Sequence, residues 1–72
     1  MILLRAPQAG LFESFVNVEQ EVTEGMLLAR ILSPVDGEEL ACIRAPKDGI
    51  VFFLHNEPLT YEHTAVLKLI PL

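Results

Sequence analysis

The candidate metal ligands of the 72-residue chain are Cys42, His55, Glu57, Glu62 and His63. Zinc ligands usually occur in close pairs such as Cys-x-x-Cys or His-x-x-x-His, and no such pair is present. His55 and Glu57 alternate to one side of an extended segment. Ligand types without a recognisable spacing are mostly solvated loop residues, so the sequence predicts no metal site in this chain.

The sequence gives little support to catalysis by a nucleophile or by paired acids. Cys42, the only cysteine, lies in an apolar stretch, so we expect a small, buried and unreactive core residue. Glu38 with Glu39, and Glu19 with Glu21, form acid pairs that we expect to point into water. Acid–base catalysis needs a cleft, which so small a domain is not expected to form. The sequence therefore predicts no catalytic residue.

Charge and composition limit the possible partners. The chain has ten acidic and five basic residues, a net charge of -5, and 51% hydrophobic residues, which favours a folded globule. The basic residues are scattered, so we expect binding to neither nucleic acid nor membrane. A single cysteine suits a reducing compartment, so we expect a cytoplasmic protein. No apolar run approaches the roughly 20 residues of a membrane-spanning helix.

An internal repeat organises the chain. Shifted by 39 positions, residues 4–12 (Leu-Arg-Ala-Pro-Gln-Ala-Gly-Leu-Phe) fall on residues 43–51 (Ile-Arg-Ala-Pro-Lys-Asp-Gly-Ile-Val). The Arg, Ala, Pro and Gly are identical, and the flanking positions stay apolar. Continued without a gap, the shift pairs Leu28 with Leu67 and Ile31 with Ile70.

The repeat predicts the domain organisation. We expect a single domain over residues 1–72, with halves at 1–31 and 40–70 joined by a hairpin linker at 32–39. Because two copies are too few for a solenoid, each half is expected to cover the open face of the other. The result would be a pseudo-twofold domain. Arg5 and Arg44 occur in both halves, which favours a structural role, since a catalytic site needs only one copy.

Each half favours strands over helices. Proline disfavours a helix at each Ala-Pro pair, and Gly10 and Gly49, three residues later, can adopt positive φ and close a turn. Residues 18–31 have a helix-like apolar spacing, but Gly25 interrupts it and the matching segment contains Pro58. Asp-Gly at 36–37 indicates a hairpin. The expected strands are 2–5, 10–16, 26–32, 39–44, 49–54 and 65–70.

This pattern resembles the biotinyl/lipoyl-type fold, an all-β flattened barrel called the barrel-sandwich hybrid. Carrier domains of that fold present a lysine at a hairpin tip for attachment of biotin or lipoate. The corresponding segment here, residues 33–39, contains no lysine. Lys47 lies in an Ala-Pro turn and Lys68 in the last expected strand, so the sequence predicts no covalent cofactor.

A closer resemblance is to the C-terminal domain of the succinylglutamate desuccinylase/aspartoacylase family. It rests on residues 22–31 (Val-Thr-Glu-Gly-Met-Leu-Leu-Ala-Arg-Ile), 43–52 (Ile-Arg-Ala-Pro-Lys-Asp-Gly-Ile-Val-Phe) and the ending 56–65. One departure is His63-Thr64, where a glycine turn is common in that family. The resemblance implies a non-catalytic accessory domain that packs beside the active site of a zinc-dependent amidohydrolase acting on N-acyl amino acids, and restricts that site.

The resemblance also implies where the chemistry and the partner lie. The catalytic domain would be upstream in the same polypeptide, with the zinc, a His-x-x-Glu pair, a distant His and a catalytic Glu, none of which is in this chain. A homo-oligomer could form through that parent. One residue here, Tyr61, would reach towards the substrate, although Thr60 could take that place. The alternative function is a lipoyl-like interaction module, as in membrane-fusion adaptors, without an attached cofactor.

Overall fold

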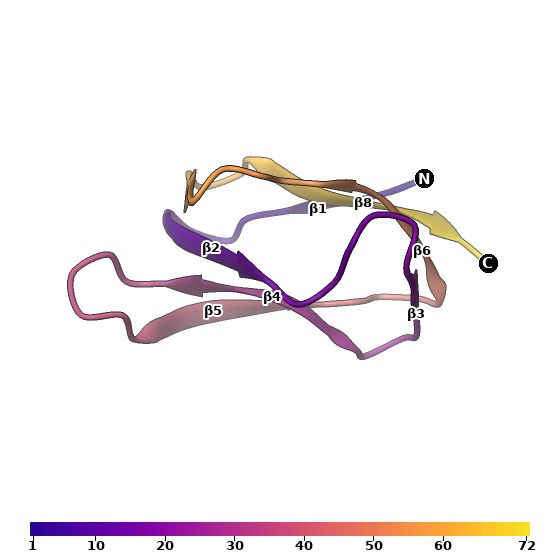
Figure 1. Ribbon diagram of the computed structural model, residues 1–72, viewed down its shortest axis with the longest axis horizontal. Coiled ribbons are helices and arrows are strands. Elements are labelled where there is room, and N and C mark those ends of the chain that lie inside the picture. Colours follow the sequence, from indigo (N-terminus) through magenta and orange to yellow (C-terminus); the bar gives the residue numbers. More distant parts are fainter.

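The computed structural model describes all 72 residues and contains eight strands and no helix. The strands form two antiparallel four-stranded sheets, packed as two layers (Figure 1). The first sheet has the order β1-β8-β6-β3 and the second β5-β4-β2-β7. The strands are Ile2–Arg5 (β1), Gly10–Ser14 (β2), Glu21–Val22 (β3), Leu27–Leu32 (β4), Glu39–Arg44 (β5), Gly49–Leu54 (β6), Leu59–Thr60 (β7) and Ala65–Pro71 (β8).

The expected all-β class is confirmed, and so is the strand assignment of residues 18–31. The six expected strands each appear with ends within two residues of the predicted ones. Thr23 to Met26 form a turn closed by a backbone hydrogen bond of 3.0 Å. The two short strands β3 and β7 were not predicted, because two residues are too few to show an alternating pattern. No helix is present that could cross a membrane.

The repeated segments form corresponding strands in the two sheets. In the repeat, β1 corresponds to β5, β2 to β6, β3 to β7 and β4 to β8. Exchanging each strand for its counterpart converts the order of the first sheet into that of the second. Individual hydrogen bonds correspond as well. The amide of Ala6 donates to the carbonyl of Thr64 at 2.8 Å, and the amide of Ala45 donates to that of Met26 at 3.0 Å.

The ungapped alignment of the halves is wrong by one residue in the last strand of each. The burial patterns of β4 and β8 match when Leu28 is paired with Val66 and Ile31 with Leu69, rather than with Leu67 and Ile70. Strand pairing agrees, because Ile31 lies opposite Phe12 and Leu69 lies opposite Val51. The connection between β6 and β7 (residues 55–58) is two residues shorter than that between β2 and β3 (residues 15–20), and an extra residue at the register shift in β6 reduces the net difference to one.

The glycines after the two Ala-Pro turns are needed for close packing of backbones. A Cβ on Gly10 would lie 2.6 Å from the carbonyl oxygen of Leu32, and a Cβ on Gly49 would lie 2.7 Å from that of Ile70. Those carbonyls belong to corresponding residues of β4 and β8. At Gly49 the requirement is for an absent side chain alone, since its φ is not positive, whereas Gly10 also has a φ of 159°.

Two arginines form hydrogen bonds to corresponding turns of the two halves. The Arg5 guanidinium donates from Nη1 to the carbonyl oxygen of His63 at 2.8 Å, and that of Arg44 donates to the carbonyl of Gly25 at 3.1 Å. Both turn residues adopt positive φ, 70° for His63 and 85° for Gly25. The repeated arginines thus have the structural role expected from their presence in both halves.

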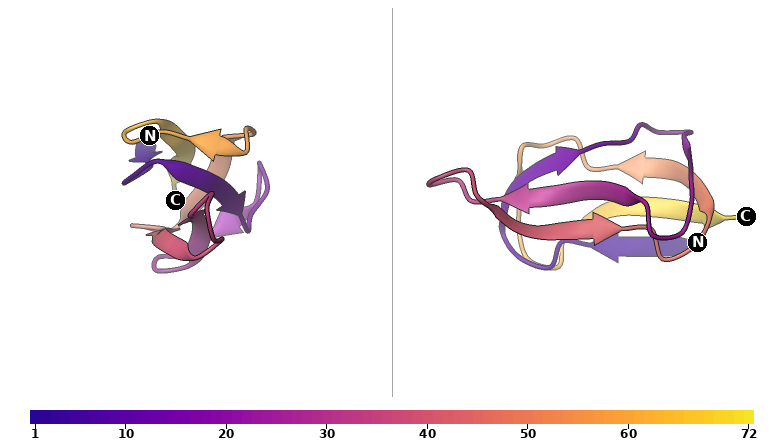
Figure 2. Two further views of the ribbon diagram at one scale, coloured as in Figure 1. Left: turned by 90° about the vertical axis from the view of Figure 1, so that its left-hand side faces the viewer. Right: turned by 90° about the horizontal axis from the view of Figure 1, so that it is seen from below.

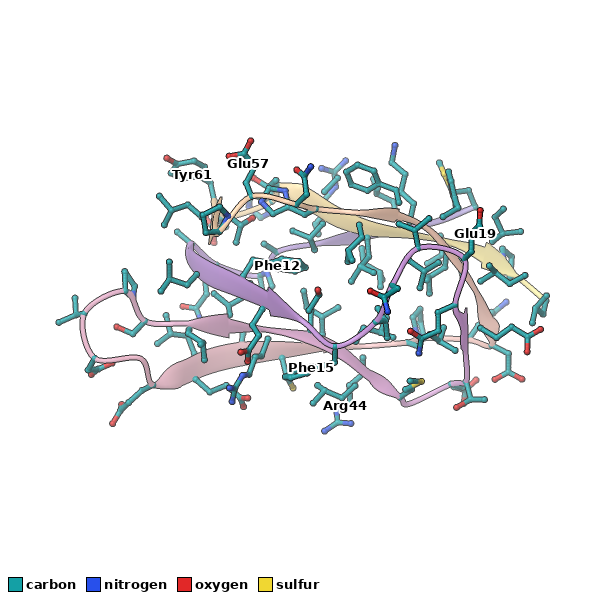
Figure 3. All side chains as sticks on the ribbon, in the orientation of Figure 1. Phe12, Phe15, Glu19, Arg44, Glu57 and Tyr61 are labelled. Carbon is teal, nitrogen blue, oxygen red and sulfur yellow. The ribbon has the colours of Figure 1, made fainter.

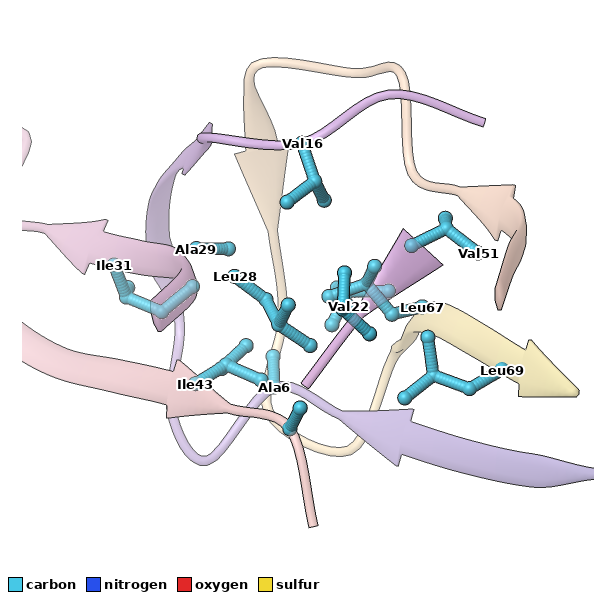
Figure 4. Packing of buried hydrophobic residues seen from close by; sticks show 12 residues of the cluster. Ala6, Val16, Val22, Leu28, Ala29, Ile31, Ile43, Val51, Leu67 and Leu69 are labelled. Carbon is cyan, nitrogen blue, oxygen red and sulfur yellow. The ribbon is translucent and has the colours of Figure 1, made fainter. Parts of the chain in front are cut away.

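The core lies between the sheets and consists almost entirely of aliphatic residues (Figure 4). Leu28 and Ile31 from β4 and Leu67 and Leu69 from β8 are completely buried. Ala29 of β4 corresponds to the larger Leu67 of β8, so a small and a large side chain occupy equivalent positions. The full cluster is Ala6, Val16, Val22, Leu28, Ala29, Ile31, Ile43, Ala45, Val51, Val66, Leu67 and Leu69.

The hairpin between β4 and β5 projects from one end of the molecule (Figure 2). It gives the fold an elongated shape, with extents of 38 × 18 × 17 Å. The amide of Ser33 donates to the carbonyl of Glu38 at 2.7 Å, and Gly37 adopts a φ of 76° at the turn. The hairpin predicted from the Asp-Gly pair is confirmed.

A buried hydroxyl gives the first testable prediction. Thr60 of β7 is 2% exposed and its Oγ1 has no hydrogen-bond partner, whereas its counterpart in β3 is the buried apolar residue Val22. Thr60→Val should raise the free energy of unfolding by about 1–2 kcal/mol, since an unsatisfied buried polar group is removed. Urea denaturation measures the change.

The reverse substitution is the matched control for that prediction. Val22→Thr puts a hydroxyl at the equivalent position of the other half, and should lower the free energy of unfolding by about 1–3 kcal/mol. A loss of stability in Thr60→Val would show instead that the hydroxyl has a partner in solution.

Candidate functional site

The molecule has one surface pocket, an open depression of about 420 Å³. Phe12 and Ser14 of β2 form one side of it, and the segment Leu54–Pro58, which connects β6 to β7, forms the other. Two backbone hydrogen bonds of 2.8 Å hold this segment in place: from the His55 amide to Val66, and from the Phe12 amide to the Pro58 carbonyl. The pocket is thus positioned by strands from both sheets.

His55 is the most constrained polar side chain of the pocket. Its ring meets the Phe12 ring edge-on, with centroids 5.4 Å apart and an interplanar angle of 86°. Its Nε2 lies 2.9 Å from the carbonyl oxygen of Leu59, so Nε2 carries a proton and donates it. His55 therefore stabilises the end of the pocket segment, rather than being the solvated loop residue expected.

The sequence alone did not indicate this pocket. Its wall, Leu54–Pro58, includes the connection that is two residues shorter than its counterpart in the first half. The only sequence signal for this pocket was thus a break in the repeat. The residues that match between the halves reflect packing constraints that both halves share. The depression is open, so its polar groups are in contact with water.

The candidate metal ligands do not assemble. No three His, Cys, Asp or Glu side chains lie close enough together to hold an ion. His63 lies in the turn before β8 with its Nε2 3.8 Å from an Oε1 of Glu62, and both side chains are largely exposed. His55 lies in the pocket, and Cys42 lies on β5 of the second sheet. The residues of this chain therefore do not fit a zinc site.

The prediction that Cys42 is buried is wrong. Cys42 is exposed, because β5 alternates and its neighbour Ile43 takes the inward position at 7% exposure. An apolar run in a strand with one covered face does not bury every member. The acid pairs are largely exposed, as expected, although Glu39 lies 3.9 Å from Arg30, which also forms an ion pair with Glu13.

Tyr61, the residue proposed to reach the substrate, is 69% exposed. The alternative, Thr60, is buried in β7 opposite Gly10 and cannot reach a ligand outside the domain. Tyr61 and the pocket residue Glu57 both point outward at the same end of the molecule (Figure 3). Of Tyr61 and Thr60, only Tyr61 could therefore touch a substrate held by a neighbouring domain.

The environment of His55 predicts a structural role. His55→Ala removes both the aromatic edge contact and the hydrogen bond to Leu59, and should lower the free energy of unfolding by about 1–2 kcal/mol. His63→Ala is the matched control, since that side chain is exposed and should contribute less than about 0.5 kcal/mol. Thermal unfolding followed by circular dichroism measures both. Equal effects of the two substitutions would contradict the assignment.

Comparison with solved structures identifies similar proteins, whereas no family model and no curated protein matches the sequence. A succinylglutamate desuccinylase/aspartoacylase from Rhodobacter sphaeroides is 30% identical over 96% of this chain, with a TM-score of 0.85. A succinylglutamate desuccinylase from a Silicibacter species is 28% identical over 92%, with a TM-score of 0.84. The ectoine utilization protein EutE from Ruegeria pomeroyi is 25% identical over 93%, with a TM-score of 0.83.

The chain spans only about one-fifth of the length of these proteins: 21% of the Rhodobacter chain, 20% of the Silicibacter chain and 21% of EutE. The similarity thus concerns one part of each larger polypeptide. The resemblance expected from the sequence is confirmed, and the chain is similar in fold and sequence to a domain that makes up about one-fifth of succinylglutamate desuccinylase/aspartoacylase family structures.

Proposed function

We propose that the chain is a non-catalytic accessory domain of a cytoplasmic, zinc-dependent amidohydrolase that acts on N-acyl amino acids. It packs beside the active site of an upstream catalytic domain and restricts which substrates enter. The observation that carries this proposal is the coverage: at least 92% of this chain matches about one-fifth of the chains of desuccinylase and aspartoacylase family proteins.

The arrangement of the strands supports a barrel-sandwich hybrid with a pseudo-twofold axis. Corresponding strands occupy corresponding places in the two sheets, and the Arg5 and Arg44 hydrogen bonds are repeated in the two turns. We propose residues 1–72 as one domain with halves at 1–31 and 40–70. Such a fold is a rigid platform for a surface that faces a neighbour.

The placement of the side chains supports a non-catalytic role. No three metal-ligand side chains lie together, and the one pocket is open to solvent and lined by residues of β2 and of the segment Leu54–Pro58. Zinc in the proposed enzyme would therefore be held by residues outside this chain. The domain would contribute shape and, through Tyr61, one hydroxyl at the edge of the active site.

The projecting hairpin favours a second candidate function. Val35 at its tip is 92% exposed, and no lysine lies between residues 33 and 39. An exposed apolar tip suits contact with a protein partner, as in a lipoyl-like interaction module, and not attachment of a cofactor. A complex that is lost in Val35→Asp and kept in Asp36→Asn would support this alternative.

The accessory role predicts how two proteins behave in an activity assay: the isolated chain, and the whole polypeptide without this domain. The 72-residue chain alone should hydrolyse no N-acyl amino acid, even with zinc added, because it lacks a ligand cluster. The whole polypeptide without the domain should keep hydrolysis but lose discrimination between acyl amino acids of different size, seen as a smaller ratio of their kcat/KM values. Turnover by the isolated chain, or an unchanged ratio after removal of the domain, would overturn the proposal.

The proposed role of Tyr61 predicts a specific kinetic effect. Tyr61→Phe in the whole polypeptide should lower kcat/KM by about 2- to 10-fold, which corresponds to the loss of one neutral hydrogen bond. The free energy of unfolding should not change, because the ring stays and is mostly exposed. Phe15→Leu, which alters an exposed aromatic residue elsewhere, is the control and should leave kcat/KM unchanged. An unaltered kcat/KM in Tyr61→Phe would exclude contact with the substrate.

A further inference from the structure

The outer faces of the two sheets differ, although the halves are built alike. On the second sheet, Arg30 of β4 lies between Cys42 of β5 and Glu13 of β2, with which it forms an ion pair. On the first sheet, the corresponding row has Lys68 of β8 between Leu3 of β1 and Phe53 of β6.

A β-bulge in β6 increases this difference. The pairing of β6 with β8 shifts register between Val51 and Phe53, whereas β2 pairs with β4 without interruption over the corresponding residues. Bulges re-aim side chains, and this one leaves two consecutive aromatic residues in solvent, Phe52 at 41% and Phe53 at 37% exposure. A strand without the bulge would turn one of them into the core.

The exposed residues form a patch across the first sheet. Leu3 is 37% exposed and Ile70, two residues along β8 from Lys68, is 50% exposed. Lys68 is the one charge among them, and its Nζ lies 5.1 Å from the centre of the Phe53 ring. Aromatic residues with few charges are typical of the centre of a protein interface, and such a patch is unusual on a surface that stays in water. We call this set, Leu3, Phe52, Phe53, Lys68 and Ile70, the outer patch.

We propose that the outer patch is the surface through which this domain docks onto the rest of its own polypeptide. The proposal rests on the proposed function. It adds which face of the domain docks, which the comparisons do not give. The solved structures that the chain matches are about five times its length, so most of such a polypeptide lies outside this domain. The partner surface would be apolar, with a carboxylate or carbonyl oxygen opposite Lys68.

The position of β1 fits this docking face. β1 is an edge strand of the first sheet and pairs only with β8, so a segment leading into it arrives beside the outer patch. The second sheet also has exposed apolar residues, Leu40 of β5 at 43% and Leu59 of β7 at 50%, but Glu13, Arg30 and Glu39 add paired charges on or next to its outer face. Those charges are costly to remove from water, so burial of that face against a partner is the less favourable of the two.

Hydroxyl-radical footprinting of the unaltered whole polypeptide tests the proposal without any substitution. Phe52 and Phe53 report on the first sheet, and Phe15, which is 48% exposed beside Arg30 on the second sheet, is the internal control. Oxidation of Phe52 and Phe53 should be about tenfold slower than that of Phe15, because residues at the centre of an interface are fully desolvated. Equal rates, or protection of Phe15 alone, would overturn the proposal.

Thiol labelling provides a second, independent test. Cys42 is the natural reporter of the second sheet, and Leu3→Cys with Cys42→Ala places a thiol at the corresponding position of the first. In the whole polypeptide, the thiol at position 3 should react about tenfold more slowly than Cys42 with a maleimide, because a partner covers it. In urea the two rates should be equal. A thiol at position 3 that reacts as fast as Cys42 would contradict docking through this face.

Two results separate this inference from the proposed function. If removal of the domain changes substrate discrimination while the outer patch is fully reactive, the accessory role stands and the assigned face is wrong. If protection of the patch depends on protein concentration and light scattering gives twice the mass of one chain, a second copy covers the face. That result also overturns the proposed occupant.

Discussion

Each sheet takes its two central strands from one half of the chain and both of its edge strands from the other. β8 and β6 form the middle of the first sheet, flanked by β1 and β3, and β4 and β2 form the middle of the second, flanked by β5 and β7. Neither half can therefore complete a sheet, or bury an apolar face, alone. The arginine hydrogen bonds and the aliphatic core lie where the two halves meet, so they depend on this interleaving, whereas the glycine contacts join strands of the same half.

The repeat made most of the fold predictable. Residues that recur in both halves, such as Ala6 with Ala45 and Gly10 with Gly49, are those with little freedom: the alanines are buried and the glycines face a carbonyl oxygen. Sequence identity between halves was thus a signal of packing. The one-residue error in the last strands arose because aliphatic residues in a run such as 65–70 substitute for each other, and only strand pairing fixes their register.

The candidate site was less predictable, for a related reason. The pocket beside His55 and the two outward phenylalanines of β6 occur where the halves differ, through a shorter connection and a bulge. Such differences leave no pattern in a sequence until the symmetric frame is known. Cys42 shows the same limit: its position in an apolar run says nothing about which face it takes. The two halves share one fold, and the candidate functional features occur where the halves differ.

The interleaving has a consequence for how the chain reaches its structure. β4 and β5 are the only paired strands that follow one another in sequence, and every other pairing joins distant segments. Proteins dominated by such non-local pairings have high contact order and fold in roughly milliseconds to seconds. Long loops must close first, and the loss of chain entropy on closure comes before any stabilising contact forms. The hairpin at Asp36-Gly37 is the one local step, which makes it the natural starting point of folding. The same segment that projects furthest from the finished domain would then be the first to form.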